Sequence, residues 1–373
     1  MANEKKLTVL QVLPALESGG VERGTLEVGK YLVEHGHRSI VMSAGGRLVE
    51  QLLREGSEHV AWDIGAKRLS TFRLVLRLRR FLTENGVDIL HVRSRMPAWV
   101  CFMAWKGMDP ESRPHLVTTV HGPYSVNAYS AVMTKGERVI VISEMIRDYV
   151  LKNYSGVDPN KLRLIYRGVD PLASPHGYKP DSAWLERWYE EFPQTRGKKL
   201  ITLPARITRW KGQEDFIKIM GRLKDQAPKA HGLVVGETKK GKEGFLDELK
   251  AKAVELGVAD RVTFTGHRSD LREIMAISDV VLSLSREPEA FGRTTVEALS
   301  LGIPAAGYNH GGVGEQLAAI LPEGRIAVGD IRQMARLTAD WLKKPPVVPH
   351  PQPFTLEKML ASTLQTYFEV IAG

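Results

Sequence analysis

Two carboxylates stand eight positions apart in the segment Glu289-Ala-Phe-Gly-Arg-Thr-Thr-Val-Glu297, and the glycine inside it predicts the start of a helix. Eight helical steps rise about 12 Å, and partial looping shortens this span, so Glu289 and Glu297 can hold two ends of an extended ligand. The amides of Gly292, Arg293 and Thr294 would then lie between them and direct positive charge at an anionic centre. A sugar, a diphosphate and a ribose fit this order.

A second segment supplies cations. Arg206 and Lys211 follow the predicted strand at 199–205, on a loop that closes with Gly212. A planar guanidinium and an ammonium together can neutralise a departing diphosphate, whose growing negative charge is the main electrostatic demand in cleaving a sugar–phosphate bond. Either residue alone would be an ordinary solvated surface charge, but beside the glutamate pair both indicate a phosphate site.

A glycine pair near the amino end offers a third contact. Gly19 and Gly20 follow the first predicted strand and open a helix, where free amides can approach a phosphate or a sugar oxygen. A plain helix-entry turn explains the pair equally well. A nicotinamide dehydrogenase is disfavoured, because G-x-G-x-x-G is absent and no acidic residue ends the second strand.

The elements that must position these residues form two successive alternations of short apolar strands and helices. Such alternation predicts parallel sheets covered on both faces. We expect an α/β protein with two doubly wound, Rossmann-like domains at 1–168 and 199–345, joined by a linker at 169–198. A terminal helix at 355–373 is expected to pack back on the first domain. Ligands of open α/β sheets bind at the carboxyl ends of the strands, so a cleft between the domains is the expected site.

Composition places the chain among ordinary globular proteins. It has 373 residues, 43% apolar and 25% charged, which excludes disorder, collagen and coiled coil. The single Cys101 cannot form an internal disulfide and suits a reducing, cytoplasmic setting. The sequence contains no apolar stretch of 18 residues that would predict a membrane span.

Charge is the first departure from the ordinary. The chain carries 52 Lys and Arg against 43 Asp and Glu, which favours an anionic partner. In the most basic segment, Arg73, Arg77 and Arg80 are spaced to share one helix face. A solvated face is the usual explanation, and an anionic membrane surface or a phosphorylated glycolipid is the alternative. Nucleic acid is disfavoured, because aromatic residues do not alternate with these arginines.

Several motifs together resemble a known family. The segments ARITRWKG, FTGHRSDL and EAFGRTTVEALSLGIPAAGYNHGGVGE, with the early Gly-Gly loop and a strand-ending VHG, resemble the family 4 retaining glycosyltransferases over nearly the whole chain. The most specific element is the Glu-x7-Glu pair with its embedded Phe291-Gly292. The resemblance implies a GT-B fold, in which two Rossmann-like domains face a cleft. Bacterial lipopolysaccharide-core sugar transferases are the members that the chain resembles in particular.

The resemblance also implies roles for individual residues. Glu289 would hold hydroxyls of the donor sugar and Glu297 the ribose, while backbone near His267 and Arg268 would contact the base. His121 is expected beside the sugar as a second catalytic candidate, although a histidine that ends a strand is most often structural. The complete set of implied donor-binding residues is Gly19, Gly20, Arg206, Lys211, His267, Arg268, Phe291, Gly292, Arg293, Thr294 and Glu297.

The implied chemistry is attack of an acceptor hydroxyl on the face that the diphosphate leaves. A donor phosphate oxygen takes the proton, without a protein nucleophile. Retaining hydrolases place two carboxyl groups about 5 to 5.5 Å apart, whereas the glutamate pair here is suited to spanning a ligand. The sequence has no Asp-x-Asp, and we expect neither a metal nor a cofactor, because Arg206 and Lys211 can take the place of a cation.

The sequence therefore predicts a glycosyltransferase that uses a nucleotide-diphosphate sugar, expected to be a UDP-sugar, and a hydroxyl of a glycan or glycolipid. Its expected setting is synthesis of lipopolysaccharide core or another cell-envelope polysaccharide, in the cytoplasm or at the inner face of the membrane. Two alternatives stay open at this point. A sugar-nucleotide epimerase would need no acceptor, and a non-catalytic protein would bind a nucleotide sugar or a glycolipid without turnover.

Overall fold

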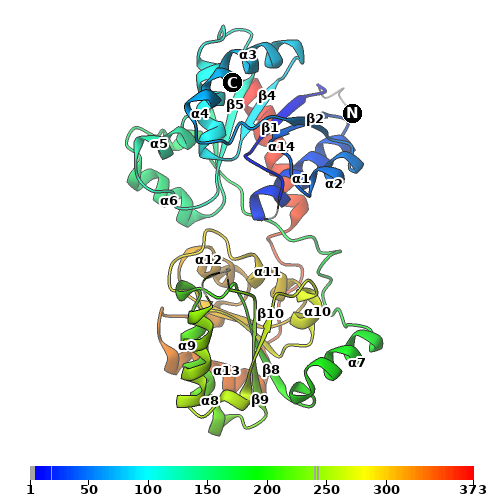
Figure 1. The fold of residues 1–373 in the computed structure, drawn as a ribbon, viewed down its shortest axis with the longest axis vertical. Coiled ribbons are helices and arrows are strands. Elements are labelled where there is room, and N and C mark those ends of the chain that lie inside the picture. Colours follow the sequence, from blue (N-terminus) through cyan, green and yellow to red (C-terminus); the bar gives the residue numbers. More distant parts are fainter. Residues whose placement is uncertain (1–4, 18, 239–240, 242) are drawn as a thin grey trace. The chain divides into compact units, whose positions relative to one another are not determined.

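The computed structural model describes residues 5–17, 19–238, 241 and 243–373. The chain divides into two compact units, Met1–Tyr166 with Glu357–Gly373, and Arg167–Leu356. Each unit is built on its own parallel sheet with helices on both sides (Figure 1).

In the first unit, the described residues form a seven-stranded sheet in the order β3-β2-β1-β4-β5-β6-β7. Every neighbouring pair is parallel, from Thr8 beside Arg38 to Val141 beside Leu164. The inner strands β2, β1, β4, β5 and β6 are buried along nearly their whole length, which is typical of a sheet covered on both faces. Its main elements are β1 Thr8–Val12, α1 Gly20–Glu34, β2 Arg38–Ser43, α2 Val49–Arg54, β3 Glu58–Ala61, α3 Leu74–Glu84, β4 Ile89–Val92, α4 Arg95–Lys106, β5 His115–Val120, α5 Ala128–Ala131, β6 Arg138–Val141, α6 Glu144–Asn153, β7 Leu162–Leu164 and α14 Leu356–Ala372.

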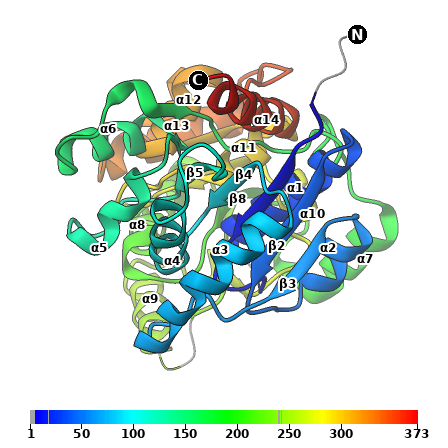
Figure 2. The same ribbon diagram turned by 90° about the horizontal axis from the view of Figure 1, so that it is seen from above.

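The terminal helix α14 packs against the strands of the first unit (Figure 1 and Figure 2). The hydroxyl of Tyr367 and Nδ1 of His91 on β4 are hydrogen-bonded at 2.7 Å, and both residues are fully buried. At the sheet edge, Arg163 Nε on β7 donates to Glu369 Oε2 at 2.8 Å. These contacts anchor a segment that is distant in the sequence.

The second unit has a six-stranded parallel sheet among its described residues, in the order β10-β9-β8-β11-β12-β13. The strand order reverses between β8 and β11, which pair directly through Ile201 and Val280. Its main elements are α7 Ser182–Glu191, β8 Lys199–Pro204, α8 Gln213–Gln226, β9 Ala230–Val235, α9 Gly244–Glu255, β10 Val262–Gly266, α10 Leu271–Ala276, β11 Val280–Ser283, α11 Arg293–Ser300, β12 Ala305–Tyr308, α12 Gly311–Ile320, β13 Arg325–Ile326 and α13 Ile331–Lys343.

Residues 169–198 are not a free connection, which corrects the interpretation of this segment as a linker. Trp184 and Trp188 on α7 are one helical turn apart, stack with ring centroids 5.4 Å apart, and are buried in a cluster with Leu200 and Leu233. The indole nitrogen of Trp184 donates to Asp270 Oδ2 at 2.9 Å. Burial of two indoles therefore makes α7 part of the second unit.

Candidate active site

Two loops of the second unit meet where its strand order reverses. Residues 205–212 follow β8, and residues 284–292 follow β11, its parallel neighbour. Parallel strands end at the same edge of a sheet, and the point of reversal is where ligands of doubly wound folds bind. The amide of Arg286 donates to the carbonyl of Trp210 at 2.7 Å and joins the loops.

The loop after β8 holds its two predicted cations in different surroundings. Arg206 is exposed, whereas only 14% of the Lys211 side chain is accessible. Gly212 closes the loop with φ 79°, and a Cβ there would lie 2.0 Å from the carbonyl oxygen of Leu284. Gln213, the first residue of α8, donates from Nε2 to the carbonyl of Arg206 at 2.9 Å. The backbone that carries Arg206 and Lys211 is therefore fixed from both ends.

The structure brings Lys211 and Glu289 together. Lys211 Nζ lies 2.8 Å from Glu289 Oε1, and 20% of the Glu289 side chain is accessible. The hydroxyl of Ser285 donates to the same carboxylate oxygen. The ammonium also lies 4.2 Å from the centroid of the Trp210 ring. This largely dehydrated pair combines a cation with an acceptor of hydrogen bonds, as binding a phosphate beside sugar hydroxyls requires.

The predicted helix start lies at Gly292. This glycine is the N-cap of α11 with φ 85°, and a Cβ there would lie 2.4 Å from Val313 Cγ2, so glycine is required. Arg293 and Thr294 form the first turn of α11. Arg293 Nε donates to Glu297 Oε1 at 2.8 Å, within the same helix. Glu289 therefore precedes the helix N-terminus, and Glu297 stands one turn beyond Arg293.

The segment between Glu289 and Gly292 is held from below by α12. The amide of Gly312 donates to the carbonyl of Glu289 at 2.8 Å, and Gln316 Nε2 donates to the carbonyl of Phe291. A Cβ on Gly312 would lie 2.4 Å from the Phe291 carbonyl oxygen. The buried ring of Phe291 packs edge-on to Phe354 at 6.2 Å. Phe291 thus anchors the loop and presents its backbone rather than its side chain.

Three supporting residues escaped the sequence analysis. Asp215 is completely buried on α8, accepts from the Tyr308 hydroxyl at 2.7 Å, and accepts from Arg286 Nε at 2.9 Å. Burial and this hydrogen bond raise the pKa of Tyr308, so the phenol stays protonated as a donor. The hydrogen bonds to Asp215 fix the side chain of Arg286, the residue that follows Ser285. An acidic residue three positions after Gly212 was the available signal, but its partners are 71 and 93 residues away.

His310 is a further residue of this site. It is the N-cap of α12, and its Nε2 lies 2.7 Å from the carbonyl oxygen of Ser285. The contact links the loop after β12 to the loop that carries Glu289. The motif NHGG contains His310, but only the fold shows that it reaches Ser285.

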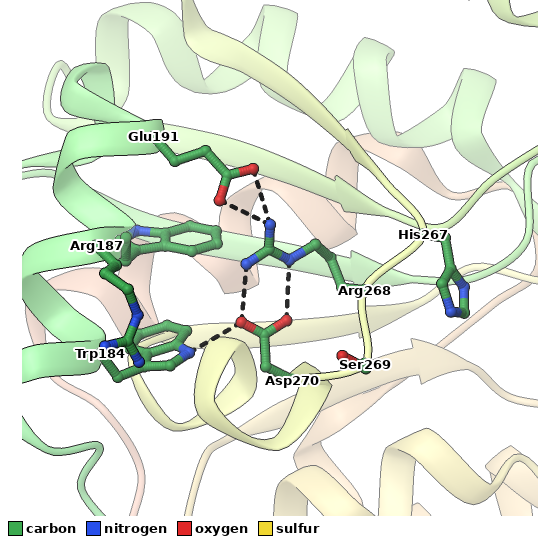
Figure 3. Close-up of a pocket in the computed structure, with 8 residues that line it drawn as sticks. Trp184, Arg187, Glu191, His267, Arg268, Ser269 and Asp270 are labelled. Carbon is green, nitrogen blue, oxygen red and sulfur yellow. Dashed lines mark hydrogen bonds and ion pairs between the residues drawn. The ribbon is translucent and has the colours of Figure 1, made fainter.

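His267 and Arg268, predicted near the base, point in different directions (Figure 3). His267 is exposed at the end of β10, with Nδ1 4.0 Å from Glu237 Oε1. Arg268 turns toward α7, where it donates to both oxygens of Glu191 at 2.8 Å and binds Asp270 with two parallel hydrogen bonds. The bond to Asp270 is the main reason that the pKa of Arg268 is raised. Its side chain is therefore engaged, and backbone remains the available contact.

These residues surround a hollow of about 470 Å³ that is lined mainly by α7 and the loop after β10. Figure 3 shows the indole of Trp184 and the guanidinium of Arg187 on the α7 side of this hollow. The lining residues are Trp184, Arg187, Trp188, Glu191, His267, Arg268, Ser269 and Asp270.

Gly19, Gly20 and His121 belong to the first unit. Gly19 is the N-cap of α1 with φ 147°, a conformation that favours glycine, and Gly20 is the first residue of the helix. Ser18, which precedes the pair, lies outside the described residues. His121 directly follows β5, and its amide donates to the Tyr124 hydroxyl at 3.3 Å.

Arg73, Arg77 and Arg80 are all exposed on the segment that leads into and along α3. Two leucines of the same segment are also exposed, Leu69 by 88% and Leu76 by 71%. The side chain of Arg77 makes a cation–π contact, because its guanidinium carbon lies 4.3 Å from the centroid of the Trp62 ring. In the described ranges, no helix combines the length and the apolar character needed to cross a bilayer.

Comparison with known proteins matches both units. The model described as Glycosyltransferase Family 4 matches residues 18–171, and the model described as Glycosyl transferases group 1 matches residues 186–353. The N-acetyl-alpha-D-glucosaminyl L-malate synthase of Bacillus anthracis is 27% identical over 316 residues, which cover 81% of this chain and 78% of that protein.

Solved structures agree over almost the whole chain. A glycosyltransferase from Rickettsia africae superposes with a TM-score of 0.81 at 28% identity and covers 98% of this chain and 99% of its own. Anabaena HepE in complex with UDP-glucose has a TM-score of 0.73 at 20% identity, covering 96% and 100% of the two chains. The two parallel sheets, the two matched models and these relatives establish that the chain is a glycosyltransferase of the GT-B fold.

Proposed function

We propose that the protein transfers a sugar from a nucleotide-diphosphate sugar to a hydroxyl of an acceptor, with retention of configuration at the anomeric carbon. The observation that carries the proposal is the contact between Lys211 and Glu289 beside the N-terminus of α11. The cation and the hydrogen-bond acceptor stand on loops that meet at the reversal of strand order, and Glu289 precedes a helix N-terminus whose first amides can bind an anion.

Each part of the donor has matching groups in this proposal. Glu289 accepts hydrogen bonds from sugar hydroxyls, and Glu297 from the ribose. Arg206 and Lys211, with the amides of Gly292, Arg293 and Thr294, bind the diphosphate. Exposed Arg206 is free to turn toward it, since the described residues include no ion-pair partner for its side chain.

The base lies against backbone at His267 and Arg268, and Gly19, Gly20 and His121 contribute from the first unit. We infer a UDP-sugar as the donor, which is the nucleotide sugar bound to HepE in its solved complex.

The reaction breaks the bond between the anomeric carbon and the diphosphate oxygen and forms a bond to the acceptor oxygen on the same face. The acceptor proton passes to an oxygen of the departing phosphate, so the step balances without a protein nucleophile. Arg206, Lys211 and the α11 amides stabilise the charge that accumulates on the leaving group. In this proposal they also make a metal ion unnecessary.

The acceptor is proposed to be a glycan or glycolipid of the bacterial cell envelope, such as lipopolysaccharide core. The motif resemblance supports this setting. The name of the Bacillus anthracis relative indicates that it uses L-malate. Transfer to a small molecule, and not to a glycan or glycolipid, would therefore contradict this part of the proposal.

Peripheral contact with an anionic membrane is part of the same proposal. Arg73, Arg77 and Arg80 are exposed, and so are Leu69 and Leu76 of the same segment. Arginines that reach headgroups and leucines that enter the boundary with the acyl chains are the two components of interfacial binding. The two exposed leucines beside the arginines favour this proposal over a purely solvated helix face.

The test is incubation with a panel of nucleotide sugars, with and without acceptors. We expect slow release of nucleoside diphosphate that accelerates when an acceptor is added. We also expect NMR to show that the product has the same anomeric configuration as the donor. Isomerised donor would favour a GT-B epimerase, and binding without turnover would favour a non-catalytic nucleotide-sugar or glycolipid binding protein. A product of inverted configuration would refute retention while leaving transfer in place.

A further inference from the structure

Arg95 on the first unit has only neutral partners among the residues that the structure describes. It is the first residue of α4 and is half-buried. Its Nη1 donates to Ser130 Oγ at 3.2 Å and to Ser125 Oγ at 3.5 Å. Its guanidinium carbon lies 4.9 Å from the ring centroid of Tyr124 and 5.5 Å from that of Tyr129.

The missing partner is a carboxylate. Two other partly buried arginines are neutralised by carboxylates: Arg163 by Glu369 at 2.8 Å, and Arg268 by Glu191 and Asp270. Among the residues that the structure describes, no carboxylate lies within ion-pair distance of Arg95. A guanidinium that has lost part of its hydration without gaining an anion is costly, unless a ligand supplies the charge.

The geometry leaves room for that ligand on the guanidinium itself. The hydrogen bonds of Arg95 within the described chain all come from Nη1, so the Nε and Nη2 edge remains as a planar pair of donors. Such a fork matches a carboxylate or a phosphate with two parallel hydrogen bonds. The aromatic faces of Tyr124 and Tyr129 hold the cation in place and do not neutralise it.

Arg95 stands at the functional edge of its sheet. Strands β4 and β5 are parallel neighbours, Arg95 lies three residues beyond the end of β4, and His121 follows β5 directly. Tyr124 connects the two positions, since its ring lies beside Arg95 and its hydroxyl accepts from the amide of His121.

We propose that Arg95 is a specificity-determining residue that binds an oxyanion of the acceptor, either a carboxylate or a phosphate. This inference rests on the proposed transfer to an acceptor bound by the first unit. It narrows the acceptor class, because the accepting hydroxyl must belong to a molecule that also carries an anionic group close to that hydroxyl.

The experiment compares acceptors that differ only in an anion. Glucose, glucuronic acid and glucose 6-phosphate are each added to the protein with its donor, and release of nucleoside diphosphate is measured for the wild type, Arg95→Gln and Arg95→Lys. Arg113→Gln is the matched control, because Arg113 also stacks on an aromatic ring, at 3.6 Å from the Trp105 centroid, but lies at the opposite edge, before β5. Thermal unfolding shows whether each variant is folded.

One of the anionic acceptors is expected to have the lower KM, and its identity distinguishes carboxylate from phosphate. Arg95→Gln should raise the KM for that anionic acceptor by about tenfold or more, because a charge-assisted hydrogen bond is lost. The KM for glucose should not change. Arg95→Lys should fall between, and Arg113→Gln should match the wild type. Equal KM values for glucose and its anionic counterparts, or an unchanged KM in Arg95→Gln, would overturn the inference.

A binding measurement separates this inference from the proposed function. Glucose 6-phosphate and glucuronic acid are titrated calorimetrically into the wild type and Arg95→Gln, with UDP present to occupy the diphosphate groups of the second unit. Binding that depends on Arg95 supports the anion site even if no donor is turned over. Absence of an Arg95-dependent difference refutes it even if transfer to other acceptors is observed.

Discussion

The contact between Lys211 and Glu289 gives the sharpest test of the site. Its two ions lie 2.8 Å apart with only 14% and 20% of their side chains accessible. The pair Arg209 and Glu248 is nearly equal in distance, at 2.7 Å, but has 69% and 55% of its side chains accessible. The comparison therefore holds distance constant and varies exposure, which determines how strongly water screens the interaction.

The perturbation is a double-mutant cycle with Glu289→Gln and Lys211→Met, beside a second cycle with Glu248→Gln and Arg209→Met. A hydrogen bond between charged groups that have lost most of their water contributes about 1.5 to 3 kcal/mol. Water screens the exposed pair, which should contribute far less. From urea unfolding we expect a coupling energy in this range for Lys211 and Glu289, which is about a 10- to 150-fold change in the unfolding equilibrium, and little coupling for Arg209 and Glu248.

Activity supplies the second measurement. Glu289→Gln and Lys211→Met should each lower kcat/KM for sugar transfer by at least about 100-fold, since each removes a charge that contacts the donor in the proposed site. Both variants of the exposed pair should retain wild-type turnover. Equal coupling energies in the two cycles would refute the argument from exposure, and undiminished turnover in Glu289→Gln would remove this residue from the site.

Three further predictions concern pH, backbone and membrane. Burial, with a smaller contribution from Lys198, lowers the pKa of His231 to about 4, so the unfolded chain binds a proton that the folded chain does not between about pH 6.5 and 4. The free energy of unfolding should therefore fall by on the order of 1 to 2 kcal/mol as the pH drops through this window. A free energy of unfolding that does not change with pH there would contradict this prediction, and so would the same pH dependence in His231→Gln. Gly292 has φ 85° and faces Val313, so Gly292→Ala should lower the free energy of unfolding by about 1 to 3 kcal/mol and reduce turnover. In the control Gly244→Ala, the added Cβ meets no atom within 4 Å, and stability should not change. Equal effects of the two substitutions in thermal unfolding would count against a strained loop at Gly292. Replacing Arg73, Arg77 and Arg80 by Gln should weaken sedimentation with vesicles containing phosphatidylglycerol by about 100-fold, at about 1 kcal/mol per residue, and Leu69→Ser with Leu76→Ser should weaken it further; unchanged attachment would leave the face solvated.

Much of the fold can be predicted from the sequence because strands of covered parallel sheets are short apolar runs. The segments that contain β4 and β8 are of this kind, and the helices between them follow from spacing. Residues 169–198 escaped this reasoning. Prolines and mixed charge there are typical of a connection, and the burial of Trp184 and Trp188 depends on a surface formed by strands that follow later in the chain.

The candidate site divides in the same way. The sequence alone determined which residue types stand close together along the chain, so Glu289, Gly292 and Glu297 could be placed around a helix start, and Arg206 and Lys211 on one loop. Only the tertiary structure decided that Lys211 meets Glu289, that Asp215 supports Arg286, that the side chain of Arg268 is engaged by Glu191, and that no carboxylate of the described residues pairs with Arg95. The reason is physical: spacing along the chain fixes local geometry, whereas charge pairing and loss of water depend on which loops parallel strands bring to the same edge of a sheet.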